Sequence, residues 1–220
     1  MWEIQIDDAI KAACPQLRLG QIQADVRVFD SPASFWDKLE PLLASKGHLT
    51  AEQIRTLPVL AAARQAYKAF GQDPSRYRLS AEALHRRFMK DQGLYHLSNV
   101  VDIVNIVSLH SAYSIGGYDT HKVNGDVSLR LGSAQDEYLT IGRGPLNIAY
   151  LPVLVDQSGP FGNPSSDSAR TCITAETKHI TLIFFDFGGQ AELEEAMQLT
   201  MHYLLEYAEA QIIGFGVQFS

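Results

Sequence analysis

A short polar stripe interrupts an apolar stretch in the middle of the chain. Asp102, Asn105 and Ser108 are spaced three residues apart among valines, isoleucines and a leucine. On a helix over residues 98–110 they would share one face, where a carboxylate and an amide can hold a polar ligand. A polar stripe among apolar neighbours has to be satisfied by a network, by water or by a pocket. Asp102 and Asn105 are therefore candidate ligand-binding residues.

Two adjacent glycines, Gly116 and Gly117, lie shortly after this stripe, and Asp119 follows them. Because glycine has no Cβ atom, it lets a backbone approach a ligand closely. We expect these three residues to line the same pocket as the polar stripe.

A loop rich in turn-forming residues and hydroxyl groups extends over residues 159–171. Such loops often carry binding residues, and an arginine can hold a carboxylate or phosphate through two parallel hydrogen bonds. Ser168, Arg170 and Thr171 are therefore candidate pocket residues. The alternative is structural: Asp167 would cap a turn, and Arg170 would pair with an acid on the body of the protein. The sequence leaves both interpretations open.

Charge is distributed unevenly along the 220 residues. The formal net charge is −7, but residues 55–90 carry eight basic and two acidic side chains, a local charge of +6. The remainder is acidic, with no lysine or arginine after Lys178. A concentrated basic surface would contact nucleic-acid phosphates; the alternative is a solvated helix surface neutralised by the acidic C-terminal helix. The candidate phosphate-binding residues are Arg64, Lys68, Arg76, Arg78, Arg86, Arg87 and Lys90.

Motifs for several other chemistries are missing from the sequence. The seven histidines have no metal-ligand spacing, no glycine pattern matches a phosphate-binding loop, and no nucleophile elbow occurs. We therefore expect neither a metal nor a cofactor. With 46% hydrophobic residues, two cysteines and no apolar run of membrane-spanning length, we expect a globular cytoplasmic protein without a membrane partner.

The elements that position these residues are predicted to follow the order helices, strands, helix, after an N-terminal strand and helix. Ser31 is expected to cap a helix with Pro32 in its first turn. Further helices are expected over residues 50–70 (broken at Pro58), 80–90, 98–110 and 191–210. Strands are expected over residues 2–6, 21–29, 127–131, 138–141, 149–155 and 179–187.

This order of elements predicts the α+β class. We expect residues 1–60 to form a strand and helix segment packed on a core of residues 61–220, within one compact domain. A last strand over residues 212–219 would either complete a sheet or pair with a second copy of the chain, which would make a homodimer.

Three motifs give the chain a resemblance to a known family. Val100-Val101-Asp102-Ile103-Val104-Asn105 comes first, then Gly117-Tyr118-Asp119, then Gly125-Asp126-Val127-Ser128-Leu129-Arg130. Together with the loop over residues 163–177, they resemble the free-standing form of the B3/B4 domain of the phenylalanyl-tRNA synthetase β subunit, over residues 64–189. The resemblance implies an α+β fold, a three-layer β-sandwich of unusual topology with helices packed on it.

In the synthetase, this domain hydrolyses tyrosine wrongly attached to the phenylalanine tRNA, and its pocket uses a Thr-Asn pair, a histidine and a glutamate. By position, Asn105 is kept here, whereas Val104, Gly116 and Ala169 stand in place of the threonine, histidine and glutamate. Without an imidazole or a carboxylate at these positions, no general base is evident.

Three functional hypotheses follow. The first is a protein that binds tRNA or aminoacyl-tRNA, with the basic segment on the phosphates and the pocket around Asn105 on the aminoacyl end. The second is a trans-acting deacylase of mischarged tRNA that uses water-mediated or substrate-assisted chemistry. The third is a small-molecule binding protein with an amino-acid ligand and no RNA partner.

Overall fold

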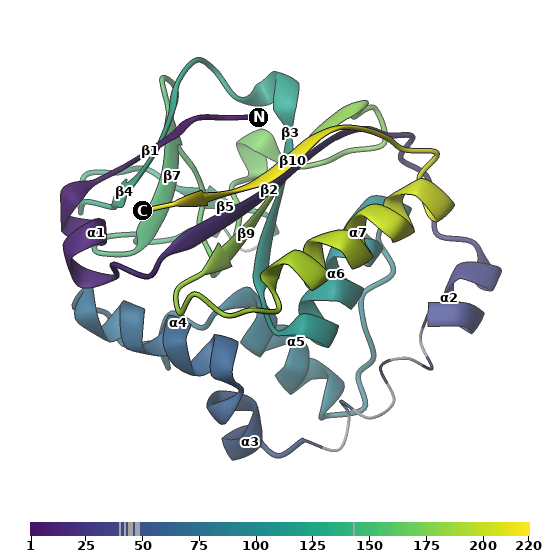
Figure 1. Cartoon of the computed structure of the whole chain (residues 1–220), viewed down its shortest axis with the longest axis horizontal. Helices are drawn as coiled ribbons and strands as arrows, with labels where there is room; N and C mark the ends of the chain where they lie inside the picture. Colours follow the sequence, from purple (N-terminus) through teal and green to yellow (C-terminus); the bar gives the residue numbers. More distant parts are fainter. Residues whose placement is uncertain (40, 42, 44–45, 47–48, 143) are drawn as a thin grey trace.

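The computed structural model describes residues 1–39, 41, 43, 46, 49–142 and 144–220. Within them, the strands form two four-stranded sheets and one two-stranded hairpin (Figure 1). The strands are β1 (Ile4–Ile6), β2 (Arg18–Asp25), β3 (Ser114–Asp119), β4 (Val127–Leu131), β5 (Leu139–Thr140), β6 (Gly144–Pro145), β7 (Pro152–Asp156), β8 (Gly159–Gly162), β9 (His179–Asp186) and β10 (Gln211–Phe219). The helices are α1 (Asp8–Ala13), α2 (Ala33–Leu39), α3 (Ala51–Thr56), α4 (Pro58–Ala69), α5 (Ser80–Phe88), α6 (Asn99–Ser111) and α7 (Leu193–Tyr207), with the 3₁₀ helices η2 (Thr120–Lys122) and η3 (Ala169–Thr171).

The two larger sheets have different strand orders. The first runs β1-β4-β7-β8, and the second runs β10-β2-β9-β3. Strand β1 is parallel to β4, and all other pairs in these two sheets are antiparallel. The N-terminal segment, residues 1–60, contributes β1 to the first sheet and β2 to the second, so it shares both sheets with the rest of the chain.

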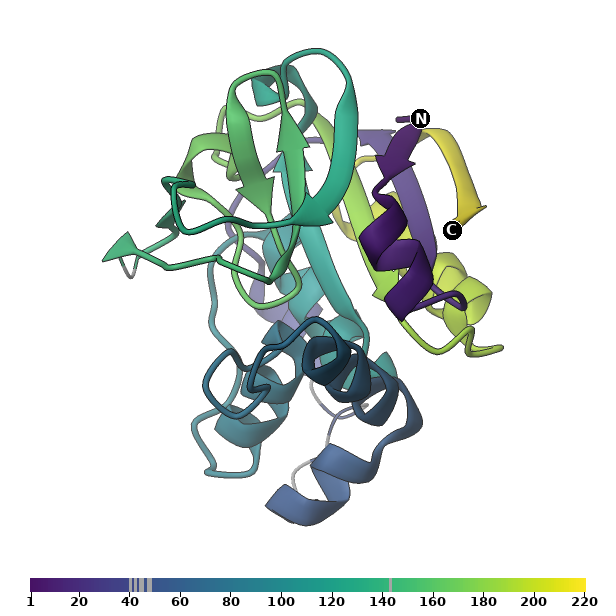
Figure 2. The ribbon, with the colours of Figure 1, turned by 90° about the vertical axis from the view of Figure 1, so that its left-hand side faces the viewer.

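The second sheet packs between helices and the first sheet. On one face, Gly20 of β2 lies so close to α7 that a Cβ atom there would be 2.7 Å from the sulfur of Met197. Helix α6 lies beside α7 (Figures 1 and 2). On the other face, the ring of Tyr118 packs against Phe161 of the first sheet, with ring centroids 5.0 Å apart. The α+β class is confirmed. No helix among the described residues is long and apolar enough to cross a membrane.

Local sequence signals set several boundaries correctly. The predicted break at Pro58 separates α3 from α4, because proline is favoured in the first turn of a helix and has no backbone N–H to donate. Gly71, with a φ of +85°, follows the end of α4.

Two local predictions were wrong or incomplete. Ser31 does not cap a helix: its hydroxyl donates to the Asp102 carboxylate at 2.6 Å, and α2 begins at Ala33. A hydrogen bond to a carboxylate is stronger than one between neutral groups, and it directs the Ser31 side chain toward Asp102. Strand β3 was not predicted as a strand because its two glycines weaken the usual strand pattern.

Candidate functional site: a basic groove beside helix α6

A groove lined by basic side chains lies between helix α5 and the β5–β6 hairpin, which projects from the body of the protein (Figure 2). Its cavity volume is about 650 Å³. Five of the predicted phosphate-binding residues line it: Arg76, Arg78, Arg86, Arg87 and Lys90. No aspartate or glutamate of the described chain belongs to this lining. The groove is therefore a concentrated positive surface on a protein whose net charge is −7.

The remaining walls of the groove are polar and apolar side chains from other elements. Asn105 lines it from α6, Thr140 and Ile141 from the hairpin region, and Ser165 and Ser166 from the loop after β8. Apart from Asn105, these residues were not among the predicted site residues. They are brought to the groove by long-range folding, and the only local signal was the run of turn formers around Ser165 and Ser166.

A buried carboxylate supports the basic cluster from beneath. The Glu82 side chain accepts hydrogen bonds from Arg64 of α4 at 2.7 Å and from Arg86 at 2.9 Å. The guanidinium of Arg78 lies 3.9 Å from the same carboxylate. Only 1% of the Glu82 side chain is exposed, so the pairing is poorly screened by water. One acid thus holds several like charges together.

The other two predicted phosphate-binding residues lie elsewhere. Arg64 points inward, where it donates to Glu82 and to the carbonyl oxygen of Pro74. Lys68 is exposed on α4 but does not line the groove. The seven predicted phosphate-binding residues are therefore five groove residues, one partly buried pairing residue, Arg64, and one separate lysine, Lys68.

The polar stripe of α6 divides among three surroundings. Asp102 is buried, where it accepts hydrogen bonds from Ser31 and from the backbone N–H of Leu97 at 2.9 Å. Burial raises the pKa of this carboxyl. Ser108 donates to the carbonyl of Tyr113 at 2.6 Å. Asn105 alone of the three faces the groove, and its amide makes no hydrogen bond within the described residues. Only this member of the stripe is available to a ligand there.

Gly116 and Gly117 border a closed network instead of the groove. The Tyr118 side chain folds back over Gly116, so that a Cβ atom at Gly116 would lie 2.0 Å from the tyrosine hydroxyl oxygen. That hydroxyl donates to Asp167 at 2.8 Å, and the Gly117 N–H donates to the same carboxylate at 3.3 Å. Burial, partly offset by these hydrogen bonds, raises the pKa of Asp167 to about 7. The space beside Gly116, where the sequence resemblance leads one to expect a histidine, is thus filled by a tyrosine ring.

Arg170 is engaged inside the protein. Its guanidinium donates two hydrogen bonds to the fully buried Asp156 side chain, at 3.0 and 2.8 Å, and a third to the carbonyl of Gly159. This is the structural alternative considered for Arg170. The pairing occupies the fork of donors that a phosphate or carboxylate ligand would need.

The remaining predicted pocket residues also have internal partners. Asp119 accepts from the Thr177 hydroxyl at 2.8 Å and from the His121 N–H at 3.1 Å. Ser168 accepts from the Arg170 N–H at the start of η3. Thr171 is fully buried. The structure therefore does not bring the eight predicted pocket residues together: Asn105 lies at the groove, and the other seven do not line it.

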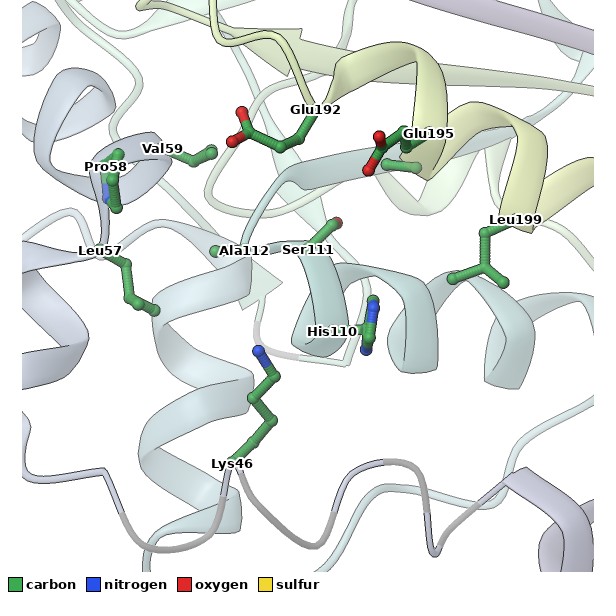
Figure 3. Close-up of a pocket in the computed structure, with 11 residues that line it drawn as sticks. Lys46, Leu57, Pro58, Val59, His110, Ser111, Ala112, Glu192, Glu195 and Leu199 are labelled. Atoms are coloured by element: carbon green, nitrogen blue, oxygen red, sulfur yellow. The ribbon is translucent and has the colours of Figure 1, made fainter.

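A second cavity, of about 440 Å³, lies between the α3–α4 junction and the helices α6 and α7 (Figure 3). Lys46 points into it from one side, and Glu192 and Glu195 border it on the other. Leu57 and Leu199 are among its apolar lining. Burial and the nearby Lys46 lower the pKa of His110 at this cavity. Opposite charges across an apolar cavity suit a small zwitterion with an apolar body.

Within the described part of the chain, no group of three or more histidine, cysteine, aspartate or glutamate side chains could hold a metal ion. His48 lies outside the described residues.

Comparison with known proteins identifies the family. The B3/4 domain matches residues 62–208, about two thirds of the chain. The chain belongs to the B3/4 domain family. Among solved structures, an N-terminal fragment of the phenylalanyl-tRNA synthetase β subunit from Pyrococcus horikoshii is similar, with 14% identity and a TM-score of 0.47. The match covers 96% of this chain and 52% of that fragment, so the chain spans about half of its length. No curated protein matches the chain.

Asp167 gives this B3/4 domain a testable pH dependence. The folded state holds the Asp167 proton up to about pH 7, whereas the unfolded chain releases it near pH 4. The stability linked to this proton is therefore complete below about pH 4 and is lost as the pH rises through 7. Asp167→Asn cannot ionise, so the melting temperature of the variant minus that of the wild type should rise between pH 5 and 8. A difference that stays constant over this range would contradict the assignment.

Proposed function

We propose that this B3/4 domain protein binds tRNA or aminoacyl-tRNA in the basic groove. The observation that carries the proposal is the set of five basic side chains that line one groove, with no acid of the described chain among them. Phosphate contacts supply much of the affinity of proteins for nucleic acids. The membership of the B3/4 family, together with the sequence resemblance to the phenylalanyl-tRNA synthetase β subunit, supports a tRNA-related partner.

The groove also offers contacts that phosphates do not use. Tyr95 lines it with 43% of its surface exposed, and the Arg87 guanidinium lies 3.9 Å from the centre of its ring. An exposed aromatic ring beside arginines can stack with an unpaired nucleotide base. Single-stranded nucleotides, such as those at the end of a tRNA, fit this combination.

Asn105 supplies the hydrogen-bonding group at the inner wall of the groove. Its amide can donate and accept at once, and no described residue occupies it. In the proposal, this amide contacts the edge of a nucleotide base or the aminoacyl group, while the surrounding arginine and lysine side chains bind the phosphates of the RNA backbone. Phosphate contacts position a nucleic acid on the protein, whereas hydrogen bonds to its bases determine which sequence is bound.

The deacylase alternative places hydrolysis in the same groove. Hydroxyl groups of Thr140, Ser165 and Ser166 line it, but no imidazole or carboxylate of the described residues does. Hydrolysis there would need a water positioned by Asn105 or a base supplied by the substrate. Binding without hydrolysis is the function that these side chains support best.

The first test removes two charges from the groove. Arg76 and Lys90 are exposed, so Arg76→Gln with Lys90→Gln should leave the fold intact. We expect tRNA affinity to fall and the slope of log K against log salt to decrease by roughly 0.7 to 0.9 for each lost phosphate contact. The measurement is a fluorescence titration of tRNA at several salt concentrations.

The matched control removes the same two charges elsewhere on the basic segment. Arg55→Gln with Lys68→Gln changes exposed residues that do not line the groove. If the control variant loses as much tRNA affinity as the groove variant, the affinity depends on the overall charge of the protein and not on the groove. Absence of wild-type binding even at low salt would refute the proposed function.

The second test separates the hydrogen bond of Asn105 to the RNA from the phosphate contacts of the basic side chains. Asn105→Leu keeps the approximate size of the side chain but removes its hydrogen bonds. We expect aminoacyl-tRNA affinity to fall roughly two- to tenfold, the range of one hydrogen bond, with an unchanged salt slope. Free amino acid is measured in the same samples. Release above the uncatalysed rate by the wild type, lost in the variant, would support the deacylase instead.

A second candidate function is the binding of an amino acid in the cavity of Figure 3, without RNA. Its support is the placement of Lys46 opposite Glu192 and Glu195 across an apolar space. A ligand carboxylate would lie near the lysine and its ammonium group near the glutamates.

This candidate predicts thermal stabilisation by amino acids, measured by differential scanning fluorimetry. Glu195→Gln should reduce the shift in melting temperature, and Asn105→Leu should leave it unchanged because Asn105 lies at the groove. No shift with any of the twenty amino acids would remove this candidate while leaving the groove proposal untouched.

A further inference from the structure

Strand β10 forms one edge of the second sheet. It pairs with β2 on one side, from Gln211↔Asp25 to Phe219↔Arg18. Its other edge has no strand partner within the described residues. Figure 2 shows β10, in yellow, at the outside of the ribbon. A row of backbone donors and acceptors therefore faces outward along this strand.

This edge lacks the usual protection against pairing. The nine residues Gln-Ile-Ile-Gly-Phe-Gly-Val-Gln-Phe contain no charged residue and no proline. The register shifts once, between Ile212 and Gly214, which leaves residues 214–219 regularly paired with β2. Natural edge strands are commonly blocked by lysine, proline or a bulge that disrupts the edge. Here the bulge lies at one end, and the six-residue stretch after it is open.

One face of the same stretch is apolar and exposed. Phe215 and Phe219 are 57% and 68% exposed. Val217 is opposite Gly20, which contacts α7. Phe215, Val217 and Phe219, as alternate residues of one strand, therefore lie on the face of the sheet that α7 covers. The open backbone edge and the apolar side chains therefore occur on the same six residues.

The alternate residues of this stretch are symmetric about its centre. Phe215-Gly216-Val217-Gln218-Phe219 has phenylalanine at both ends and a valine at its centre. In an antiparallel pair of two identical strands centred on Val217, each Phe215 lies opposite Phe219 of the second copy, and Val217 lies opposite itself. Aromatic pairs directly across two strands are among the favourable cross-strand contacts.

We propose that the chain forms a homodimer in which β10 pairs antiparallel with β10 of a second copy about a two-fold axis at Val217. The two second sheets then join into one eight-stranded sheet. A second copy of β10 fits this edge because Phe215, Val217 and Phe219 are symmetric about Val217 and therefore meet matching residues in the antiparallel direction. Acids near this edge are paired within the chain: Glu206 of α7 pairs with Lys38, and Glu209, between α7 and β10, pairs with Arg27. None of the groove-lining residues lies in β10, so the proposal is independent of tRNA binding.

The test is the mass of the full chain in solution by light scattering after size exclusion. We expect the wild type at twice the chain mass of 24.4 kDa. Phe215→Lys with Phe219→Lys puts like charges opposite each other across the axis, so this variant should have the mass of a single chain. Both positions are exposed, and the far-ultraviolet circular dichroism spectrum checks that the fold is retained. The matched control is Leu139→Lys, which is also exposed but lies in β5, and it should remain dimeric.

A second variant tests the register. Val217→Cys should form a disulfide-linked dimer under mild oxidation, because each Val217 lies opposite itself. Phe215→Cys alone should not, whereas a mixture of Phe215→Cys and Phe219→Cys chains should cross-link. A monomeric wild type, or a Lys double variant that stays dimeric, would overturn the proposal. A dimer without cross-linking at position 217 would overturn the proposed axis.

Discussion

The basic surface of this protein depends on one buried carboxylate. Glu82 pairs with Arg64 of α4 and Arg86 of α5, and it lies near Arg78 in the preceding loop. It therefore ties two helices and a loop together at the point where positive charge is densest. Without this acid, burying Arg64 and crowding the other guanidinium groups would be strongly unfavourable. The other basic side chains of the groove, Arg76, Arg87 and Lys90, form no ion pair with an acid of the described residues.

The packing between the two sheets limits what chemistry the fold can carry. Tyr118 occupies the space beside Gly116 and Gly162, where added Cβ atoms would lie 2.0 and 2.2 Å from its hydroxyl oxygen. The Tyr118 hydroxyl holds the Asp167 carboxylate inside the protein through a hydrogen bond. Among the described residues, no aspartate, glutamate or histidine lines the groove. Of the pocket expected from the sequence, Asn105 is the part that reaches the groove.

Local patterns predicted much of the fold because their causes act within a few residues. The break at Pro58 and the long apolar helix α6 are examples. The predicted pocket was less accurate because the partner of a polar side chain is not visible in the sequence. Asp102 bonds a serine 71 residues away, and Arg170 bonds an acid 14 residues away. The sequence predicts a cluster of basic residues, whereas the inward direction of Arg64 depends on its ion pair with Glu82 of α5, 18 residues away.

Lysine footprinting distinguishes binding of RNA in the groove from binding elsewhere on the basic segment. Both Lys68 and Lys90 are exposed, and only Lys90 lines the groove. The chain is acetylated with and without saturating aminoacyl-tRNA, and modification is measured by mass spectrometry. We expect bound RNA to protect Lys90 while Lys68 stays reactive. Equal reactivity of Lys90 in the free and bound protein, or protection of Lys68 alone, would contradict binding in the groove.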